Sequence, residues 1–151
     1  MKYTLSILVT CFLLLSCKKD SSSSTNKTDQ ITSADWKYDS GGIGDASGNI
    51  IIDLSTAGLA PDCLLDNTAR FKSDGTGTVY ENSNVCSGAP ATSDFTWNFS
   101  QNETVLNVST GAIAGIGGSF KIKTLTSSQL SLLKDTTILG TAGTIVVNLK
   151  H

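Results

Sequence analysis

Apolar residues recur at every second position along most of this chain of 151 residues. A period of two is typical of strands that bury one face, whereas helices repeat apolar residues every three or four positions. The clearest case is residues 94–100, where Phe95, Trp97 and Phe99 fall on one face. Other runs of this kind occupy residues 34–39, 49–54, 104–109, 118–126, 128–133 and 144–150. The pattern predicts an all-β domain.

Two of the predicted connections are tight turns. Residues 68–81 contain two strand-like runs around Ser73-Asp74-Gly75-Thr76, and Asp-Gly supplies the positive backbone angles that a tight hairpin needs. Residues 100–104 join a second pair of runs. About eight strands with closely spaced turns predict an antiparallel up-and-down β-barrel, with a β-sandwich as the alternative.

One short helical turn is predicted before the first hairpin. Pro61 and Asp62 precede a short apolar stretch, and Asp is a favoured N-cap residue, so we expect Asp62 to cap this turn.

The first twenty residues have a different pattern. Lys2 is followed by an apolar run from about Leu5 to Leu15, which is shorter than the ~18 to 20 residues that span a bilayer. This arrangement indicates a secretory signal over residues 1–16.

The end of that run, Leu14-Leu15-Ser16-Cys17, resembles the lipobox of bacterial lipoproteins. The resemblance implies cleavage before Cys17 and attachment of acyl chains such as palmitate to Cys17. More than one chain anchors a protein stably in a membrane. The alternative is a plain signal peptide that happens to contain two cysteines, Cys11 and Cys17.

Residues 18–32 are poor in apolar side chains, which predicts a disordered tether that follows the lipidated Cys17. The barrel domain is then expected over residues 33–151. By analogy with lipoprotein sorting, Lys18 is not the aspartate that retains such proteins in the inner membrane. We therefore expect an outer-membrane anchor, on either the periplasmic face or the cell surface.

Export also changes the interpretation of the cysteines. With Cys11 removed and Cys17 lipidated, Cys63 and Cys86 are the remaining thiols, and outside the cytosol they can form a lasting disulfide. A loop of this length is stabilised by roughly 3.5 kcal/mol. A metal pair would need further Cys or His ligands, and a redox pair is normally closely spaced, so a structural bridge is predicted.

Several short motifs occur in the order seen in lipocalin-like domains of bacterial lipoproteins. They are Trp36, Cys63 with Asp66, residues 70–80, Cys86, Trp97 and residues 121–133. The resemblance covers residues 33–150 and implies a barrel that binds without catalysing a reaction. The glycine-rich segments at 111–118 and 140–143 depart from the family pattern.

Charge and composition exclude several function classes. The net charge is −2 and the eleven basic residues are scattered, which argues against a nucleic-acid partner. The single histidine, His151, excludes a Ser-His-Asp or Cys-His nucleophile and a multi-histidine metal site within one chain. We therefore predict no catalytic residue, no metal ligand and no cofactor.

Weaker candidates for chemistry have ordinary structural interpretations. A carboxylate pair of Asp53 with Glu81 or Asp94 is better explained by solvated strand ends. The glycine-rich residues 41–49 and 111–118 are predicted to be loops. Residues 45–49 have calcium-loop spacing without the distal glutamate, so calcium is not predicted.

Six aromatic residues are predicted to point into the barrel: Trp36, Phe71, Tyr80, Trp97, Phe99 and Phe120. They either line a cavity for an apolar ligand or fill the interior, because an eight-stranded barrel allows both. The sequence thus predicts a non-enzymatic, lipid-anchored envelope protein that binds a small apolar molecule. The alternative is a protein-binding module, such as an inhibitor of an envelope hydrolase.

Overall fold

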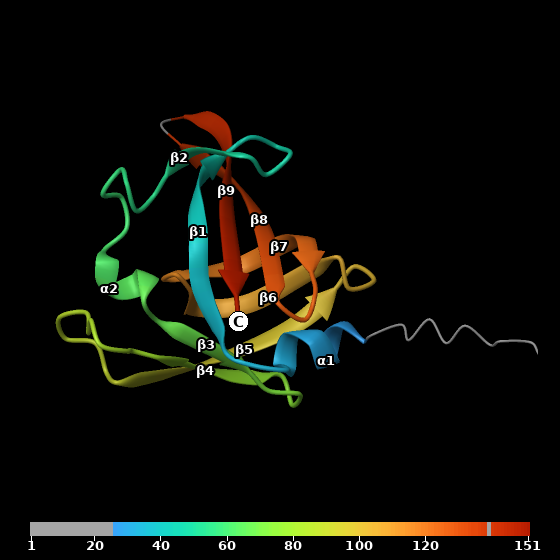
Figure 1. Cartoon of the computed structure of the whole chain (residues 1–151). Coiled ribbons are helices and arrows are strands. Elements are labelled where there is room, and N and C mark those ends of the chain that lie inside the picture. Colours follow the sequence, from blue (N-terminus) through green and yellow to red (C-terminus); the bar gives the residue numbers. More distant parts are fainter. Residues whose placement is uncertain (1–25, 139) are drawn as a thin grey trace, which may run out of the picture.

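In the computed structural model, which describes residues 26–138 and 140–151, the chain is an antiparallel β-barrel (Figure 1). The strands are β1 (Trp36–Gly44), β2 (Ile50–Asp53), β3 (Thr68–Phe71), β4 (Thr76–Tyr80), β5 (Thr92–Ser100), β6 (Val105–Ile113), β7 (Ile116–Leu125), β8 (Gln129–Ile138) and β9 (Thr141–Lys150). The helices are α1 (Lys27–Thr32) and α2 (Asp62–Leu65).

The strand order is β2-β1-β3-β4-β5-β6-β7-β8-β9, and β1 also pairs with β9. This last pairing closes a barrel of eight strands, with β2 as an addition at the edge of β1. The predicted up-and-down barrel is therefore confirmed. The predicted signal, the lipidated Cys17 and residues 18–25 of the tether lie outside the described residues.

The tether prediction is wrong for its last six residues, which form α1. The Asn26 side chain caps this helix by accepting a hydrogen bond from the Thr28 N–H at 2.9 Å. Ile31 is fully buried in the core, and its carbonyl oxygen accepts a 2.7 Å hydrogen bond from the Trp36 indole. One apolar residue in a polar stretch is too weak a pattern to predict a helix. In the folded chain, however, Ile31 packs into the core at this end of the barrel.

The core is largely as the period of two predicts. Phe95 and Trp97 are buried on one face of β5, and Phe99 packs against the same cluster. The prediction that Tyr80 points into the barrel is wrong, because this residue is 37% exposed. Val79 pairs with the buried Ala69 and occupies the inward position, so the next residue along β4 points outward.

The loop prediction is confirmed for residues 45–49, which connect β1 to β2, but most of residues 41–44 and 111–118 belong to strands. Residues 41–44 belong to β1, and residues 111–118 supply the end of β6, a two-residue turn and the start of β7. At Gly42 a Cβ atom would collide with the Ile52 carbonyl of β2. Glycine is therefore used here for close backbone approach, which the sequence pattern does not distinguish from flexibility.

The predicted disulfide is present, and it joins Cys63 in α2 to Cys86 in the loop after β4, with a Cα–Cα distance of 5.1 Å. The capping prediction for α2 is wrong. Pro61 occupies the N-cap position and Asp62 is already in the first turn. The fixed φ of proline suits a helix start without help from a capping side chain.

Candidate functional site

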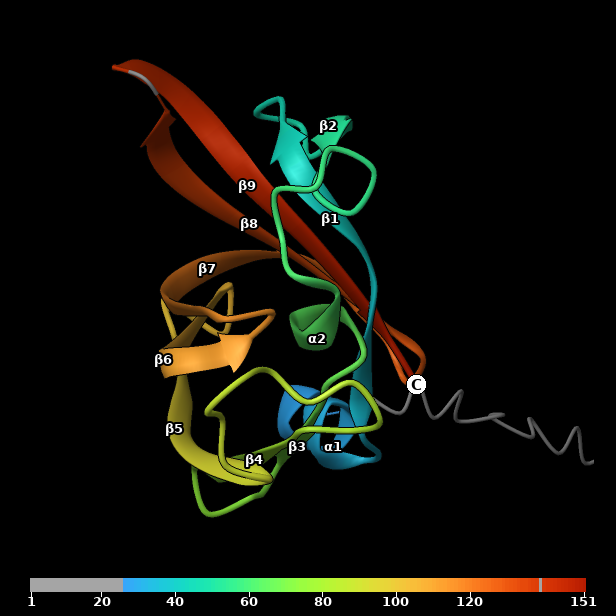
Figure 2. The same ribbon diagram turned by 90° about the vertical axis from the view of Figure 1, so that its left-hand side faces the viewer.

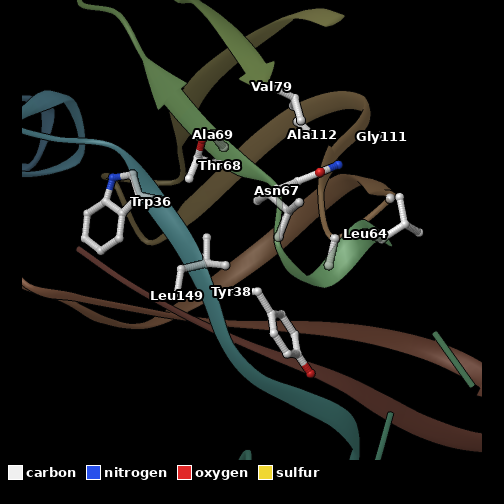
Figure 3. Close-up of a pocket in the computed structure, with 13 residues that line it drawn as sticks. Trp36, Tyr38, Leu64, Asn67, Thr68, Ala69, Val79, Gly111, Ala112 and Leu149 are labelled. Carbon is white, nitrogen blue, oxygen red and sulfur yellow. The ribbon is translucent and has the colours of Figure 1, made fainter. Parts of the chain in front are cut away.

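The centre of the barrel is filled. A cavity of about 20 Å³ remains, and Figure 3 shows residues that line it, among them Trp36 of β1, Leu64 of α2, Leu149 of β9 and Asn67 between α2 and β3. About 10 to 15 Å³ is the space that one water molecule needs. This inner space is therefore too small for an organic ligand, and the buried aromatics Trp36, Phe71, Phe95, Trp97 and Phe120 help to fill the barrel.

A larger apolar cavity of about 290 Å³ lies at one end of the barrel, and we call it the mouth cavity. Its described lining consists of small and aliphatic residues with one threonine: Gly42, Ile43, Leu54, Leu59, Ala60, Pro61, Leu64, Ala114, Ile116, Thr136, Ile138 and Ile145. These residues come from the end of β1, the segment before α2, α2 itself, the β6–β7 turn and the β8–β9 hairpin.

The wall between β2 and α2 is held by local hydrogen bonds. The Leu59 N–H donates to the Leu54 carbonyl at 2.9 Å, and the Asp53 carboxylate accepts from the Ser55 hydroxyl and from the Thr56 N–H. The hydrogen bond from the Ser55 hydroxyl is the main cause that lowers the pKa of Asp53 below its usual value of 3.8. The Cys63–Cys86 bridge then pins α2 and with it Leu64, which reaches both cavities.

The mouth cavity exists because two hairpins separate. The described pairing of β7 with β8 begins at Lys121 opposite Leu133 and continues only toward the other end of the barrel. Beyond that point β8 continues beside β9 as far as Ile138, and Figure 2 shows the β8–β9 hairpin extending away from β6 and β7. The space between them is open at its rim, where Leu59 is 57% exposed.

The described lining contains no ionisable side chain. It therefore supplies neither a general acid nor a nucleophile, and it favours an apolar occupant. An engineered aliphatic cavity of about 150 Å³ holds one benzene ring, so the mouth cavity has space for roughly twice that volume.

The carboxylates considered from the sequence are engaged in separate structural tasks. Glu81 accepts from the Asn67 amide at 2.7 Å and from the Cys86 N–H at 3.1 Å, and so fixes the disulfide loop. Asp94 accepts from the Thr78 hydroxyl at 3.0 Å. Glu81 and Asp94 both line a hollow of about 300 Å³, whereas Asp53 holds its own turn beside the mouth cavity.

Residues 45–49, which have the spacing of a calcium-binding loop, form a turn. Asp45 accepts from the N–H groups of Ser47 and Asn49, each at 2.9 Å, and from the Asn49 amide at 2.8 Å. The hydrogen bond from the Asn49 backbone is the largest of the causes that lower the pKa of Asp45. Its oxygens thus close the β1–β2 connection.

His151 lies at the opposite end from the mouth cavity, where its ring packs on Trp36 with a centroid distance of 3.9 Å. Burial, followed by the nearby Arg70 charge, lowers the pKa of His151 below 6.5. Its role in the structure is to cover the ring of Trp36.

Within residues 26–138 and 140–151, no group of three or more His, Cys, Asp or Glu side chains is placed to share a metal ion. In the same residues no helix has the length and apolar character needed to cross a bilayer.

No local pattern in the sequence indicates the mouth cavity, because its lining comes from four separated stretches of the chain. Ile116 and Ile138 belong to β7 and β8 beyond the point where these two strands stop pairing, and Leu59 lies in a segment without a period. Each is unremarkable alone, and only the tertiary fold brings them together.

No protein-family model matches the chain, and no curated protein is significantly similar to it in sequence. We therefore infer the function from the barrel and its cavities.

Proposed function

We propose that this protein is a non-enzymatic, lipid-anchored protein of the bacterial cell envelope, with a lipocalin-like barrel that binds a small apolar molecule in the mouth cavity. The observation that carries the binding proposal is the cavity of about 290 Å³ whose described lining has no ionisable group. Ligand pockets are generally apolar clefts of roughly this size or larger.

The rim of the cavity supports reversible binding. Leu59 is largely exposed while Leu54 and Ala60 are half-buried, so an apolar molecule can pass along this segment without crossing a charged barrier. Covering Leu59 and the neighbouring isoleucines removes apolar area from water, which is worth about 25 cal/mol per Å².

The start of the described chain and the mouth cavity lie at opposite ends of the barrel. The described chain begins beside α1, which packs at the end where Trp36 and Ile31 meet, whereas the β6–β7 and β8–β9 turns surround the cavity at the other end (Figure 1).

A protein-binding role is the second candidate, and exposed isoleucines favour it. Ile51 and Ile52 on β2 are 71% and 43% exposed. β2 is an edge strand that pairs with β1 alone among the described strands. With four residues, this edge is short for strand addition, so a small-molecule ligand remains the leading proposal.

Native mass spectrometry of the freshly purified protein tests the proposal. We expect a co-purifying apolar molecule with the wild type and with Ala89→Trp, since Ala89 lies in the connection between β4 and β5 and does not line the mouth cavity. Ala60→Trp, which fills the cavity from its loop wall, should release that molecule. Retention of the same molecule by Ala60→Trp would place the ligand elsewhere, and a bound protein would favour the second candidate.

A further inference from the structure

Thr136 is the one residue with a polar side chain in the described lining of the mouth cavity. The other lining residues are glycine, alanine, proline, leucine and isoleucine, whose side chains neither donate nor accept hydrogen bonds. The hydroxyl group of Thr136 can do both. It is therefore the single place on the described walls where a side chain can form a hydrogen bond with a ligand.

The position of Thr136 in the sheet turns its side chain toward the cavity. Thr136 follows the fully buried Leu132 by four residues and precedes the lining residue Ile138 by two, so all three share the inward face of β8. The described pairing of β7 with β8 reaches no further toward the β8–β9 hairpin than Leu133. Thr136 is therefore paired with β9 alone, where its partner Gly143 has no side chain to cover it.

The hydroxyl group of Thr136 is accessible and has no hydrogen-bond partner within residues 26–138 and 140–151. In contrast, Ser131 on the same strand donates its hydroxyl to the Asn148 side chain at 2.6 Å. The buried side-chain oxygens that lack a partner in the described part of the chain belong to Asp66 and Asn67. Thr136 is not among them although it is half-buried, so water reaches its hydroxyl group.

An accessible hydroxyl group in an aliphatic cavity selects for a particular ligand chemistry. A hydrocarbon that fills the cavity displaces the water at Thr136 and leaves the hydroxyl without a partner, which is unfavourable. A ligand with one hydrogen-bonding group replaces that water. A charged group would find no counter-charge in the described lining, so its burial there would be costly.

We propose that the ligand of the mouth cavity is an uncharged, largely apolar molecule with one hydrogen-bonding group, such as an alcohol, and that Thr136 selects for this group. The inference rests on the proposed function and specifies the ligand class for the same site. The aliphatic residues of the lining cover the remainder of the molecule.

Methyl NMR titrations of the isoleucine-labelled full chain with hexanol and with hexane test the inference, because the two probes differ only in the hydroxyl group. Thr136→Val removes the protein's hydroxyl and keeps the shape of the side chain. We expect this variant to bind hexanol about three- to tenfold more weakly than the wild type, which is the usual worth of one hydrogen bond. Its affinity for hexane should be unchanged or higher, since no hydroxyl is left unpaired.

Two further variants assign the effect to the hydroxyl group. Thr136→Ser keeps a hydroxyl and should retain the wild-type ratio of hexanol affinity to hexane affinity. Thr137→Val is the matched control, because Thr137 is exposed and lies outside the described lining. It should change the affinity for neither probe.

The outcomes separate this inference from the proposed function. If Thr136→Val weakens both probes equally or weakens neither, the inference is overturned and the proposed function stands. A ratio that falls as far in Thr136→Ser as in Thr136→Val also overturns the inference, because the serine variant retains the hydroxyl. Failure of the wild type to bind either probe overturns both proposals.

Discussion

The indole ring of Trp97 meets the phenyl ring of Phe71 edge to face, with centroids 5.5 Å apart and an interplanar angle of 82°. Trp97 also donates its indole N–H to the carbonyls of Lys72 and Thr76, at 3.1 and 2.9 Å. One side chain thus packs the core and fixes the turn between β3 and β4. Aromatic pairs of this geometry add to the stabilisation that burial alone provides.

Replacement of Trp97 by Ala should lower the free energy of unfolding by about 3 to 5 kcal/mol, because it leaves a cavity in the core and removes the two indole hydrogen bonds to the turn. Denaturant unfolding measures the loss. Asn98→Ala is the control, since Asn98 is exposed on the other face of β5 and should change stability little. A similar loss in both variants would contradict the assignment of Trp97 to the core.

Loss of the Cys63–Cys86 bridge should cost about 2 to 5 kcal/mol. The double Cys→Ala variant is compared with the wild type in denaturant unfolding, with and without a thiol reductant. The reductant should destabilise the wild type and leave the variant unchanged. Equal stability of the reduced and oxidised wild type would show that α2 is held without the bridge.

Acid should destabilise the protein through the aspartates of its turns. Hydrogen bonds lower the pKa values of Asp45, Asp53 and Asp74 below 3.8, with the Thr76 hydroxyl as the largest cause for Asp74. A depressed pKa in the folded state contributes stability above the unfolded value, and this contribution is lost as the pH falls through the folded values.

Unfolding free energies at about pH 6 and about pH 2.5 test this effect, since the window lies below the unfolded value of 3.8. Asp74→Asn keeps one acceptor oxygen for the Thr76 N–H but cannot titrate. Its pH dependence should therefore be weaker than that of the wild type. An identical dependence would exclude Asp74 as a contributor.

The membrane anchor is tested at Cys17. Metabolic labelling with a fatty-acid analogue should mark the wild type, and Cys17→Ala should lose both the label and the membrane fraction. Cys11→Ala is the control, because Cys11 lies within the predicted signal and should be removed with it. Secretion in membrane-free form that is unaltered by Cys17→Ala would contradict the lipid anchor.

The parts of the fold that could be predicted are those in which one face of a strand is buried. Phe95 and Trp97 reveal β5 because alternation in the sequence is alternation between core and solvent. The disulfide followed from elimination among four cysteines. Tyr80 was misplaced because an apolar residue, Val79, is its neighbour, and a strand only four or five residues long does not fix which of the two points inward.

The site was beyond the reach of sequence reasoning for a different reason. Thr136 and Ile138 of β8 line the mouth cavity, and in the sequence they are indistinguishable from ordinary residues near a hairpin end. Their position beside the cavity depends on where β7 and β8 stop pairing. Strand separation is a property of the sheet as a whole, and local pattern does not encode it.

Binding at the mouth cavity is tested most directly by methyl NMR of the isoleucine-labelled full chain during titration with decanol, an uncharged probe with an apolar chain. Four isoleucines line the cavity, Ile43, Ile116, Ile138 and Ile145, whereas Ile31 is buried at the other end of the barrel. We predict saturable shifts of the four lining methyl groups and an unchanged Ile31 signal. Unchanged lining signals, or shifts confined to the exposed Ile51 and Ile52, would contradict ligand binding at this site.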